Sequence, residues 1–333
     1  MQCIALQTYR IKAKDAYKVK TLGMTESKTC DSQYTPSDLT NKLDGASKNT
    51  DYYDMRRISN PRTVAINRIL AQVLRRPYLA VPPEAPFFQV GTYLATGSKI
   101  YVDGLIVARD NELVGRIGGK HILRHVLNMR YDDWSSVTAF ELMDGSTSSV
   151  EIDSSLSSLL ELFARTKFAL APITSKGFLV GSIVIRDLLP LISEMALDTP
   201  VTMIASPIAR ICNTETLKNS IDIMLKMNIR NLVISSGDVN DESNYILNDR
   251  KILEFIFSYE GRKIMEQELG EKALSSVNVT CLDMIPVPSI SGDQTISKIA
   301  AMLRDIGTPG LLLKNHIVTP WDVVMKTIGK GTI

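Results

Sequence analysis

Near the end of the chain, Thr319 and Asp322 have the types and the spacing of a helix start that could also hold a polar ligand. They follow the apolar Val318, and Pro320 comes directly after Thr319. Thr at the N-cap, Pro at the first helical position and a carboxylate at the third are common at helix N-termini, because both side-chain oxygens can accept backbone amide protons. Capping alone would explain the pair. Evidence for a binding role would be the recurrence of the same structural position in other parts of the chain.

Motifs that would indicate catalysis fail on their spacing. Residues 115–121, GRIGGKH, resemble a phosphate-binding loop, but only three residues separate Gly115 from Gly119, and His121 stands where a magnesium-binding Ser or Thr would follow Lys120. The serine-rich run SSLSSLL has no Lys or His at helical spacing to activate a nucleophile. With three histidines in the chain, a catalytic metal site is hard to assemble. The sequence therefore predicts no enzyme, no metal site and no catalytic cofactor.

The composition predicts a globular protein with an N-terminal tail. The 333 residues are 44% hydrophobic and 22% charged, and this length usually exceeds one compact unit. Residues 1–63 carry 11 Lys and Arg against 7 Asp and Glu, and contain only eight Leu, Ile, Val or Phe, too few to bury a core. We therefore expect residues 1–63 to form a mostly disordered, mildly basic tail.

The sequence contains no apolar segment that is long enough and free enough of charge to span a bilayer. The best candidate begins at Phe168 and is interrupted by Lys176, Arg186 and Asp187. The N-terminus has its charges after a short apolar stretch, the reverse of a signal peptide, and the four cysteines are scattered without a CxxC pair. These features predict a cytoplasmic protein with no membrane partner, and the lack of a basic stripe argues against nucleic acid.

One order of elements recurs four times between residues 64 and 330. An apolar hairpin runs into an apolar helix, and its second strand begins near Gly115, Gly181, Tyr245 and His316, at spacings of 66, 64 and 71 residues. A polar turn and an amphipathic stretch precede each hairpin. The pattern predicts the order strand, helix, strand, strand, helix in every copy.

The third copy shows the helical pattern most clearly, with Leu217, Ile221, Met224 and Leu225 on one face. We expect an α/β (α+β) fold of four tandem βαββα repeats. Their predicted ranges are 64–130, 136–195, 198–258 and 275–330. One such unit of about 60 residues buries too little surface to stand alone, so we expect repeat 1 to pair with repeat 2 and repeat 3 with repeat 4.

This repeated unit resembles the cystathionine-β-synthase (CBS) domain family, whose members carry βαββα units in tandem pairs called Bateman modules. The second copy carries the resemblance best: APITSKGFLVGSIVIRDLL matches the family's order of apolar strand, Gly, apolar strand and final Asp. The fourth copy matches nearly as well, and the first and third match by layout. A chain with four copies is similar to the γ subunit of AMP-activated protein kinase and to stand-alone archaeal and bacterial relatives.

The resemblance implies a ligand contact directly after the second hairpin strand. In nucleotide-binding members this element reads Thr/Ser-x-x-Asp, and its carboxylate accepts both ribose hydroxyls. The equivalent positions here read Gly118-x-x-His121, Val184-x-x-Asp187, Asn248-x-x-Lys251 and Thr319-x-x-Asp322. Only the fourth copy keeps both residues, so it is the best candidate.

The resemblance also implies partners for this pair in the third copy. Arg230 stands two residues before Leu232, which we align with the family's usual Pro, and an arginine there often meets the ligand phosphate. Asn228 and Ile229 would line the sugar side, and Ile317 is one of the apolar strand residues that would flank adenine. The simpler alternative for Arg230 is a surface residue favoured by the dipole at a helix end.

The second copy implies a poorer cleft. Asp187 keeps the carboxylate, but Val184 replaces the hydroxyl. The paired first copy offers Asp103 or Gly104 where a phosphate would need a cation. Such a cleft suits a nucleoside or no ligand.

The function implied by the resemblance is that of a regulatory protein that binds an adenine nucleotide or nucleoside, such as AMP, ADP, ATP or S-adenosylmethionine. A protein partner or a second copy of the chain would receive the signal. The alternative is an interaction scaffold with degenerate clefts. The departures in copies one and three favour the scaffold, whereas Thr319, Asp322 and Arg230 favour the sensor.

We predict that limited proteolysis removes the tail and leaves a core that begins near Val64, because residues 1–63 hold too few apolar side chains to resist cleavage. Mass spectrometry of the trimmed product locates the boundary, and its thermal melt reports whether it still folds. A tail that resists the protease, or a trimmed product without a cooperative melt, would contradict this boundary.

Overall fold

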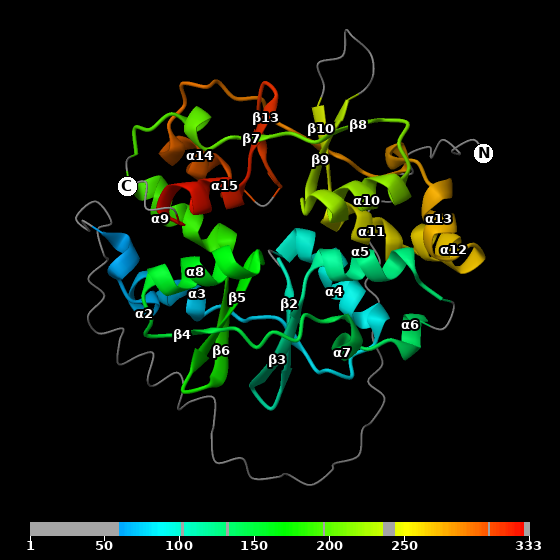
Figure 1. Ribbon diagram of the computed structural model, residues 1–333, viewed down its shortest axis with the longest axis horizontal. Coiled ribbons are helices and arrows are strands. Elements are labelled where there is room, and N and C mark those ends of the chain that lie inside the picture. The colour runs from blue at the N-terminus through cyan, green and yellow to red at the C-terminus, as the bar shows by residue number, and fades with distance from the viewer. Residues whose placement is uncertain are drawn as a thin grey trace, which may run out of the picture. The chain divides into compact units, whose positions relative to one another are not determined.

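The structure is a computed structural model that describes residues 60–100, 103–130, 133–195, 197–235, 244–305 and 307–329 (Figure 1). The predicted tail lies outside these residues except for its last four, of which Pro61–Thr63 form the 3-10 helix η2. Buried Pro61 belongs to this helix, and Arg62 donates from Nη2 to the Ser157 hydroxyl of repeat 2 over 3.4 Å. These last residues therefore contact the folded repeats.

The predicted order of elements is confirmed in repeats 1 and 2. Repeat 1 consists of β1 Ala80–Val81, α4 Phe87–Ile100, β2 Leu105–Arg109, β3 Glu112–Ile117 and α5 Gly119–Leu127. Repeat 2 consists of β4 Val150–Glu151, α8 Leu156–Thr166, β5 Leu170–Ser175, β6 Phe178–Val184, the 3-10 helix η3 Ile185–Leu188 and α9 Leu189–Glu194.

Repeats 3 and 4 follow the same order. Repeat 3 consists of β8 Arg210–Cys212, α10 Leu217–Met227, β9 Asn231–Ser235, β10 Asn244–Asn248 and α11 Asp249–Ile256. Repeat 4 consists of α14 Ile296–Met302, β12 Leu311–Leu313, β13 His316–Val318, α15 Pro320–Val324 and the π-helix η6 Met325–Gly329. Its first strand is reduced to a single parallel bridge between Ser289 and Leu312.

Short elements lie before and between these βαββα elements, several of them inside the predicted ranges of the repeats, and pack onto them. Before β1 lie α2 Ile66–Ile69 and α3 Ala71–Leu74; between repeats 1 and 2 lie α6 Asp133–Ser136 and α7 Ala139–Leu142. Between repeats 2 and 3 lie η4 Val201–Met203 and β7 Ser206–Pro207; between repeats 3 and 4 lie α12 Tyr259–Gln267, α13 Gly270–Ser276, η5 Val279–Cys281 and β11 Ile285–Pro286. Ile66, Leu70 and Leu74 join the core of repeat 2, although they precede β1, the first strand of repeat 1, in the sequence.

Each repeat forms a small sheet around its antiparallel hairpin. The strand orders are β1-β2-β3, β4-β5-β6, β11-β10-β9-β8 and β12-β13-β7. The strand before the helix pairs in parallel with the first hairpin strand in repeats 1 to 3. The connecting strand β7 joins the sheet of repeat 4 by pairing with β13, with Ser206 opposite Ile317. The segment before repeat 3 therefore lies close to the start of α15, the helix that follows β13.

Local sequence explains why these elements form where they do. In α10, Leu217, Ile221 and Met224 are fully buried, as the helical spacing predicts, and Leu225 is partly buried against the same core. The turn between β2 and β3 places Asp110 and Asn111 at φ of 51° and 64°. Asp and Asn tolerate this left-handed region, which a tight two-residue hairpin turn requires.

The predicted pairing of the repeats is confirmed by two small clusters of buried strand residues. Ile106 of repeat 1 packs with Leu170 and Leu179 of repeat 2. Val233 and Ile246 of repeat 3 pack with Leu312 and Ile317 of repeat 4. The sheets therefore face each other within two Bateman modules, repeats 1 and 2 and repeats 3 and 4.

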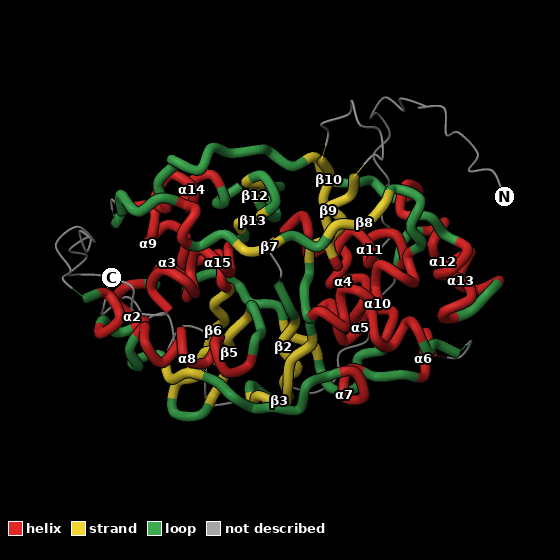
Figure 2. Tube along the Cα trace, turned by 45° about the horizontal axis from the view of Figure 1, so that its top comes forward, coloured by secondary structure: helices red, strands yellow, loops and turns green. Residues whose placement is uncertain are grey.

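The two modules meet through their helices, which the sequence did not predict. One core joins α4 and α5 of repeat 1 to α10 and α11 of repeat 3, and a second core joins α8 and α9 of repeat 2 to α14 and α15 of repeat 4. Figures 1 and 2 both show these two groups of helices at opposite ends of the described core, with the strand pairs between them. Every repeat therefore contacts one neighbour through its sheet and another through its helices.

We predict that the helix-mediated core carries much of the stability. Phe163 on α8 is fully buried in it, so Phe163→Ala should lower the free energy of unfolding by about 3–5 kcal/mol, since the loss combines apolar transfer and a residual cavity. Phe178 is 56% exposed in the same repeat and provides a matched control, for which Phe178→Ala should change it by no more than about 0.5 kcal/mol. Denaturant unfolding of both variants measures the difference, and equal effects would contradict the assignment.

Candidate ligand-binding site

The four positions aligned by sequence all begin the helix that follows the hairpin. Gly118, Val184, Asn248 and Thr319 are the N-cap residues, each with extended backbone. In repeats 1, 2 and 4 the side chain three residues later accepts a hydrogen bond from the N-cap amide. In repeat 3 the direction reverses, and Asn248 Oδ1 accepts from the Lys251 amide at 2.8 Å. The four helix starts are therefore structurally equivalent, while their side chains differ.

Strand register also defines equivalent residues before the first hairpin strand. Asn231 pairs with the N-cap Asn248, and Leu170 pairs with the N-cap Val184. Pro172 in repeat 2 consequently matches Val233, one residue beyond the Leu232 that sequence alignment chose. By the same register Arg230 matches Asp103 in repeat 1, Ala169 in repeat 2 and Pro309 in repeat 4.

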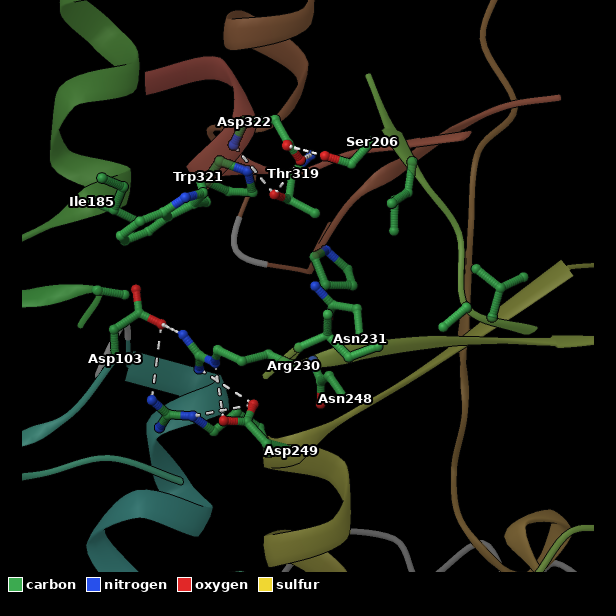
Figure 3. A pocket seen from close by; sticks show the side chains of 18 of the residues that line it. Asp103, Ile185, Ser206, Arg230, Asn231, Asn248, Asp249, Thr319, Trp321 and Asp322 are labelled. Atoms are coloured by element: carbon green, nitrogen blue, oxygen red, sulfur yellow. Dashed lines mark hydrogen bonds and ion pairs between the residues drawn. The ribbon is translucent and has the colours of Figure 1, made fainter. Parts of the chain in front are cut away.

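These equivalent residues meet around one cavity of about 580 Å³, which we call the four-repeat pocket (Figure 3). Asp103, Ala169, Arg230 and Pro309 all line it. Its volume lies within the range of about 300–1,000 Å³ that small-molecule sites occupy. Six of the predicted site residues line it: Ile317, Thr319, Asp322, Asn228, Ile229 and Arg230. The seventh, Asp187, is not among the lining residues.

On one wall of the pocket, Asp322 is buried and already holds several hydrogen bonds. Its Oδ2 accepts from the Thr319 amide at 3.0 Å and from the Thr319 hydroxyl at 2.7 Å. Its Oδ1 accepts from the Ser206 hydroxyl at 2.5 Å and lies 2.9 Å from Lys326 Nζ. The carboxylate therefore caps the helix with one oxygen and presents the other to two polar groups that a ligand hydroxyl could replace.

On the opposite wall, Arg230 is held between two carboxylates (Figure 3). Its Nε and Nη2 donate to Asp249 at 2.9 and 3.3 Å, and its Nη1 donates to Asp103 at 2.8 Å. Arg250 is buried beside them, with Nη2 3.8 Å from Asp103 and Nε 3.9 Å from Asp249. We call Asp103, Arg230, Asp249 and Arg250 the ion cluster. It joins repeat 1 to repeat 3 across the two modules.

The rest of the pocket wall is apolar on the side of repeat 4 and cationic toward repeats 1 and 2. Trp321 lies beside Ile185 at the edge of the pocket (Figure 3), and Val233 and Ile317 come from the paired sheets. Lys120 and Arg186, each two residues after its N-cap, also line the cavity, and the Arg186 guanidinium donates to the backbone carbonyls of Leu303, Asp305 and Thr308. The wall thus offers apolar surface for a ring and polar groups at both ends.

Sequence analysis missed several of these residues. Ser206 and Asp249 reach the pocket from the connection before repeat 3 and from the start of α11, and no motif marks either of them. Lys326 follows Asp322 by four residues, a spacing that places both side chains on one helix face and could have been found. Sequence analysis noted that Asp103 stands where a phosphate would need a cation, but it did not predict that Asp103 pairs with Arg230.

Within repeats 1 and 2, the cleft at Gly118 is filled by a side chain of the protein itself. Phe168 packs so closely that a Cβ atom on Gly104 or Gly118 would lie 3.0 and 2.9 Å from its ring. His121 stacks on the same ring with centroids 5.7 Å apart, and the buried Arg116 guanidinium lies 4.8 Å from its centre. Burial lowers the pKa of His121, which suits its neutral Nδ1 as the acceptor from the Gly118 amide.

Asp187 forms an ion pair with Arg76, which precedes β1 in the sequence. Its Oδ2 accepts from the Val184 amide at 2.8 Å and from Arg76 Nη2 at 2.7 Å. Burial raises the pKa of Asp187 above its ordinary value, although the Arg76 guanidinium opposes the shift. The carboxylate thus has an internal cation at the place where the sequence implied a sugar contact.

Within the described ranges, no group of three or more His, Cys, Asp or Glu side chains is arranged to hold a metal ion. Among the helices of those same ranges, none combines the length and the apolar character needed to cross a bilayer.

Comparison with known proteins identifies the fold. No family model matches the sequence, and no curated protein matches it. A structure from Methanocaldococcus jannaschii, described as a candidate archaeal homologue of γ-AMPK, superposes with a TM-score of 0.66 at 16% identity over 78% of this chain and 99% of that chain. A CBS-domain-containing protein from Thermotoga maritima matches 38% of this chain and 92% of its own at 20% identity, with a TM-score of 0.31.

At these identities the likeness concerns the fold alone. The first match extends over 78% of this chain and nearly the whole of the other chain. The chain therefore has the fold of a tandem CBS-domain protein with two Bateman modules, and its function has to be argued from its own site residues.

We predict that Arg76→Met lowers the free energy of unfolding by about 1–3 kcal/mol at pH 7, because it leaves the buried Asp187 carboxylate without its cation. The pKa of Asp187 in the folded state would then rise further above the unfolded value. A raised carboxyl pKa means that the folded protein binds the proton more tightly, so the loss should shrink as the pH falls toward about 4. Thermal or denaturant unfolding across this pH range measures the effect.

The neighbouring Arg75→Met, at an exposed residue, is the control for the change of net charge. It should show little effect at any pH. If the destabilisation by Arg76→Met did not shrink between pH 7 and about pH 4, Asp187 would not be the group that Arg76 stabilises.

Proposed function

We propose that this protein is a non-catalytic regulatory protein that binds an adenine nucleotide or nucleoside in the four-repeat pocket. Asp322 would accept the ribose hydroxyls, with Thr319 beside it. Asn228 and Ile229 would line the sugar side, and Ile317 would flank the base. Arg230 would lie nearest to a phosphate if the ligand carries one.

The observation that carries this proposal is the convergence of Asp322 and Arg230 on one pocket. The two residues are 92 positions apart in the sequence and belong to different repeats, yet both line the same cavity. Among the described residues, Oδ1 of the buried Asp322 is bound by the Ser206 hydroxyl and the Lys326 ammonium group, and it can exchange these for a diol. Helix capping uses only Oδ2, so Oδ1 has no part in it.

The lining also fits a flat aromatic base beside the sugar. Ile317 is largely buried between the sheets of repeats 3 and 4, and Val233 and Ile208 belong to the same apolar cluster. Apolar walls with a few fixed polar groups are typical of small-molecule sites. S-adenosylmethionine, AMP, ADP and ATP share the adenosine part that this region would hold.

Ligand binding in this pocket would bear on how the two modules pack. Asp103 and Lys120 come from one module, and Arg230 and Asn228 from the other. Lys120 Nζ donates to Asn228 Oδ1, and Asp103 accepts from Arg230, so both contacts link the modules at the pocket wall. A ligand that favours one arrangement of these groups shifts the equilibrium between arrangements, and a protein partner or a second copy of this chain would read the change.

The scaffold alternative is favoured by the state of repeats 1 and 2. Phe168 fills the cleft at Gly118, and Arg76 occupies Asp187, so this module holds its own side chains where a ligand would bind. A chain in which all clefts have been closed in this way would present only its outer surface. The size of the four-repeat pocket argues against that alternative for repeats 3 and 4.

We predict that adenosine or an adenine nucleotide binds the wild-type protein and that Asp322→Ala lowers the affinity about ten- to a hundredfold. The physical reason is the loss of charge-assisted hydrogen bonds from a buried carboxylate, worth about 1.5–3 kcal/mol. Isothermal titration calorimetry with adenosine, AMP, ADP, ATP and S-adenosylmethionine measures the affinities.

Asp187→Ala is the matched control, because it removes the carboxylate at the equivalent position of repeat 2, including its bond from the N-cap amide. It should leave the affinities unchanged within about twofold. Absence of binding by the wild type at millimolar ligand, or normal binding by Asp322→Ala, would leave Asp322 as a capping residue and support the scaffold.

A further inference from the structure

The ion cluster contains a reversal of charge between equivalent positions. Arg230 comes directly before Asn231, which pairs with the N-cap of its repeat, and Asp103 comes directly before Gly104, which the register places opposite the N-cap Gly118. Repeat 1 therefore has a carboxylate at the place where repeat 3 has a guanidinium. Because the modules bring these two places together, Asp103 Oδ1 lies 2.8 Å from Arg230 Nη1.

Asp249 completes the enclosure of Arg230 from the other side. It is the first residue of α11 and is almost fully buried. Its two oxygens accept hydrogen bonds from Nε and Nη2 of Arg230. Its carboxylate also lies against Gly119 at the start of α5, where an added Cβ would lie 2.3 Å from Oδ2. Gly119 thus leaves the space that Asp249 needs to reach Arg230 across the module interface.

The formal charges of the ion cluster cancel, since two guanidinium groups stand against two carboxylates. A phosphate oxygen that approaches Arg230 closely also approaches the carboxylates of Asp103 and Asp249, which lie within about 3 Å of the same guanidinium. Attraction by the two guanidinium groups is then offset by the two carboxylates in a partly buried setting, where screening by water and salt is weak. Arg230 keeps its capacity to donate hydrogen bonds but supplies little net positive charge to the pocket.

The ionisation of the cluster supports this description. Burial by itself would raise the pKa of Asp103, but the guanidinium groups of Arg230 and Arg250 outweigh it and hold that pKa below its ordinary value. Burial likewise opposes the charge of Arg230, and the two carboxylates reverse the effect and raise its pKa. Both partners therefore stay charged at neutral pH.

We propose that Asp103 determines the ligand specificity of the four-repeat pocket, so that the pocket favours an adenine nucleoside without a phosphate over its 5′-phosphate. This inference rests on the proposed function, because it assumes that adenosine binds at Asp322. Adenosine and AMP form the simplest test pair, since they differ only in the phosphate group.

Calorimetry with adenosine and AMP is performed on the wild type, Asp103→Asn and Asp187→Asn. Asn at position 103 keeps an oxygen that can accept from Arg230 but removes the charge, so the fold is retained and the cluster becomes cationic. The wild type should bind AMP no more tightly than adenosine. Removal of one negative charge near the phosphate should raise the affinity of Asp103→Asn for AMP at least about tenfold. Its affinity for adenosine should stay within about threefold of the wild-type value. Asp187→Asn makes the same change of net charge at a buried carboxylate outside the pocket and should leave the ratio unaltered.

Ionic strength provides a second measurement. The ratio of the AMP and adenosine affinities should fall more steeply with added salt in Asp103→Asn than in the wild type, because removal of this carboxylate leaves the ion cluster with a net positive charge that salt can screen. A wild type that binds AMP tenfold more tightly than adenosine, or an unchanged ratio in Asp103→Asn, would overturn this inference while adenosine binding still supports the proposed function. If neither compound binds the wild type at millimolar concentration, the proposed function fails and this inference fails with it.

Discussion

Each repeat of this protein has two apolar faces and is too small to bury either by itself. The hairpin presents one face through its strands, and the helices present the other. A unit of about 60 residues leaves much of its apolar surface open to water, so it needs a neighbour on both sides. Sheet faces are covered within the modules, by contacts such as Ile106 against Leu170, and helix faces are covered between the modules. Four repeats arranged in this way bury the sheet face and the helix face of every repeat.

This arrangement brings equivalent residues of the four repeats to one place. The residue before each first hairpin strand and the helix start after each second strand face the region where the modules meet, so Asp103, Ala169, Arg230 and Pro309 share one cavity. Divergence at only a few positions then changes the chemistry of the whole pocket. Repeat 4 contributes a carboxylate and an aromatic ring, repeats 1 and 2 contribute cations, and the charge reversal between repeats 1 and 3 joins the modules by an ion pair.

The two modules have diverged in opposite directions. In repeats 1 and 2, Phe168 and Arg76 occupy the places where a ligand would contact Gly118 and Asp187, and these internal contacts stabilise the module without a ligand. In repeats 3 and 4, Asp322 and Arg230 remain on the wall of an open cavity. A buried carboxylate or guanidinium is costly unless it is paired, so each carries its own partners, Lys326 and Ser206 for Asp322 and two carboxylates for Arg230.

The sequence by itself determined the features that depend on neighbours along the chain. Period and turn residues predicted the βαββα units, the buried face of α10 and the capped start of α15, because these arise from hydrogen bonds and side-chain spacing within a few residues. The equivalence of the four helix starts also followed from the spacing of the repeats. The pairing of sheets within modules could be predicted because a lone repeat cannot bury its apolar strands.

Only the tertiary structure decided which side chains meet. Asp103 and Arg230 are 127 residues apart, and Arg76 and Asp187 are 111 apart, so neither pair leaves a local pattern. The helix-mediated contact between modules was equally invisible, because the same amphipathic helices could pack against several partners. That contact places a carboxylate beside the arginine that sequence analysis assigned to a phosphate. The sequence shows which residues are charged. Whether the charge of Arg230 is neutralised depends on its distances to carboxylates, which only the folded chain determines.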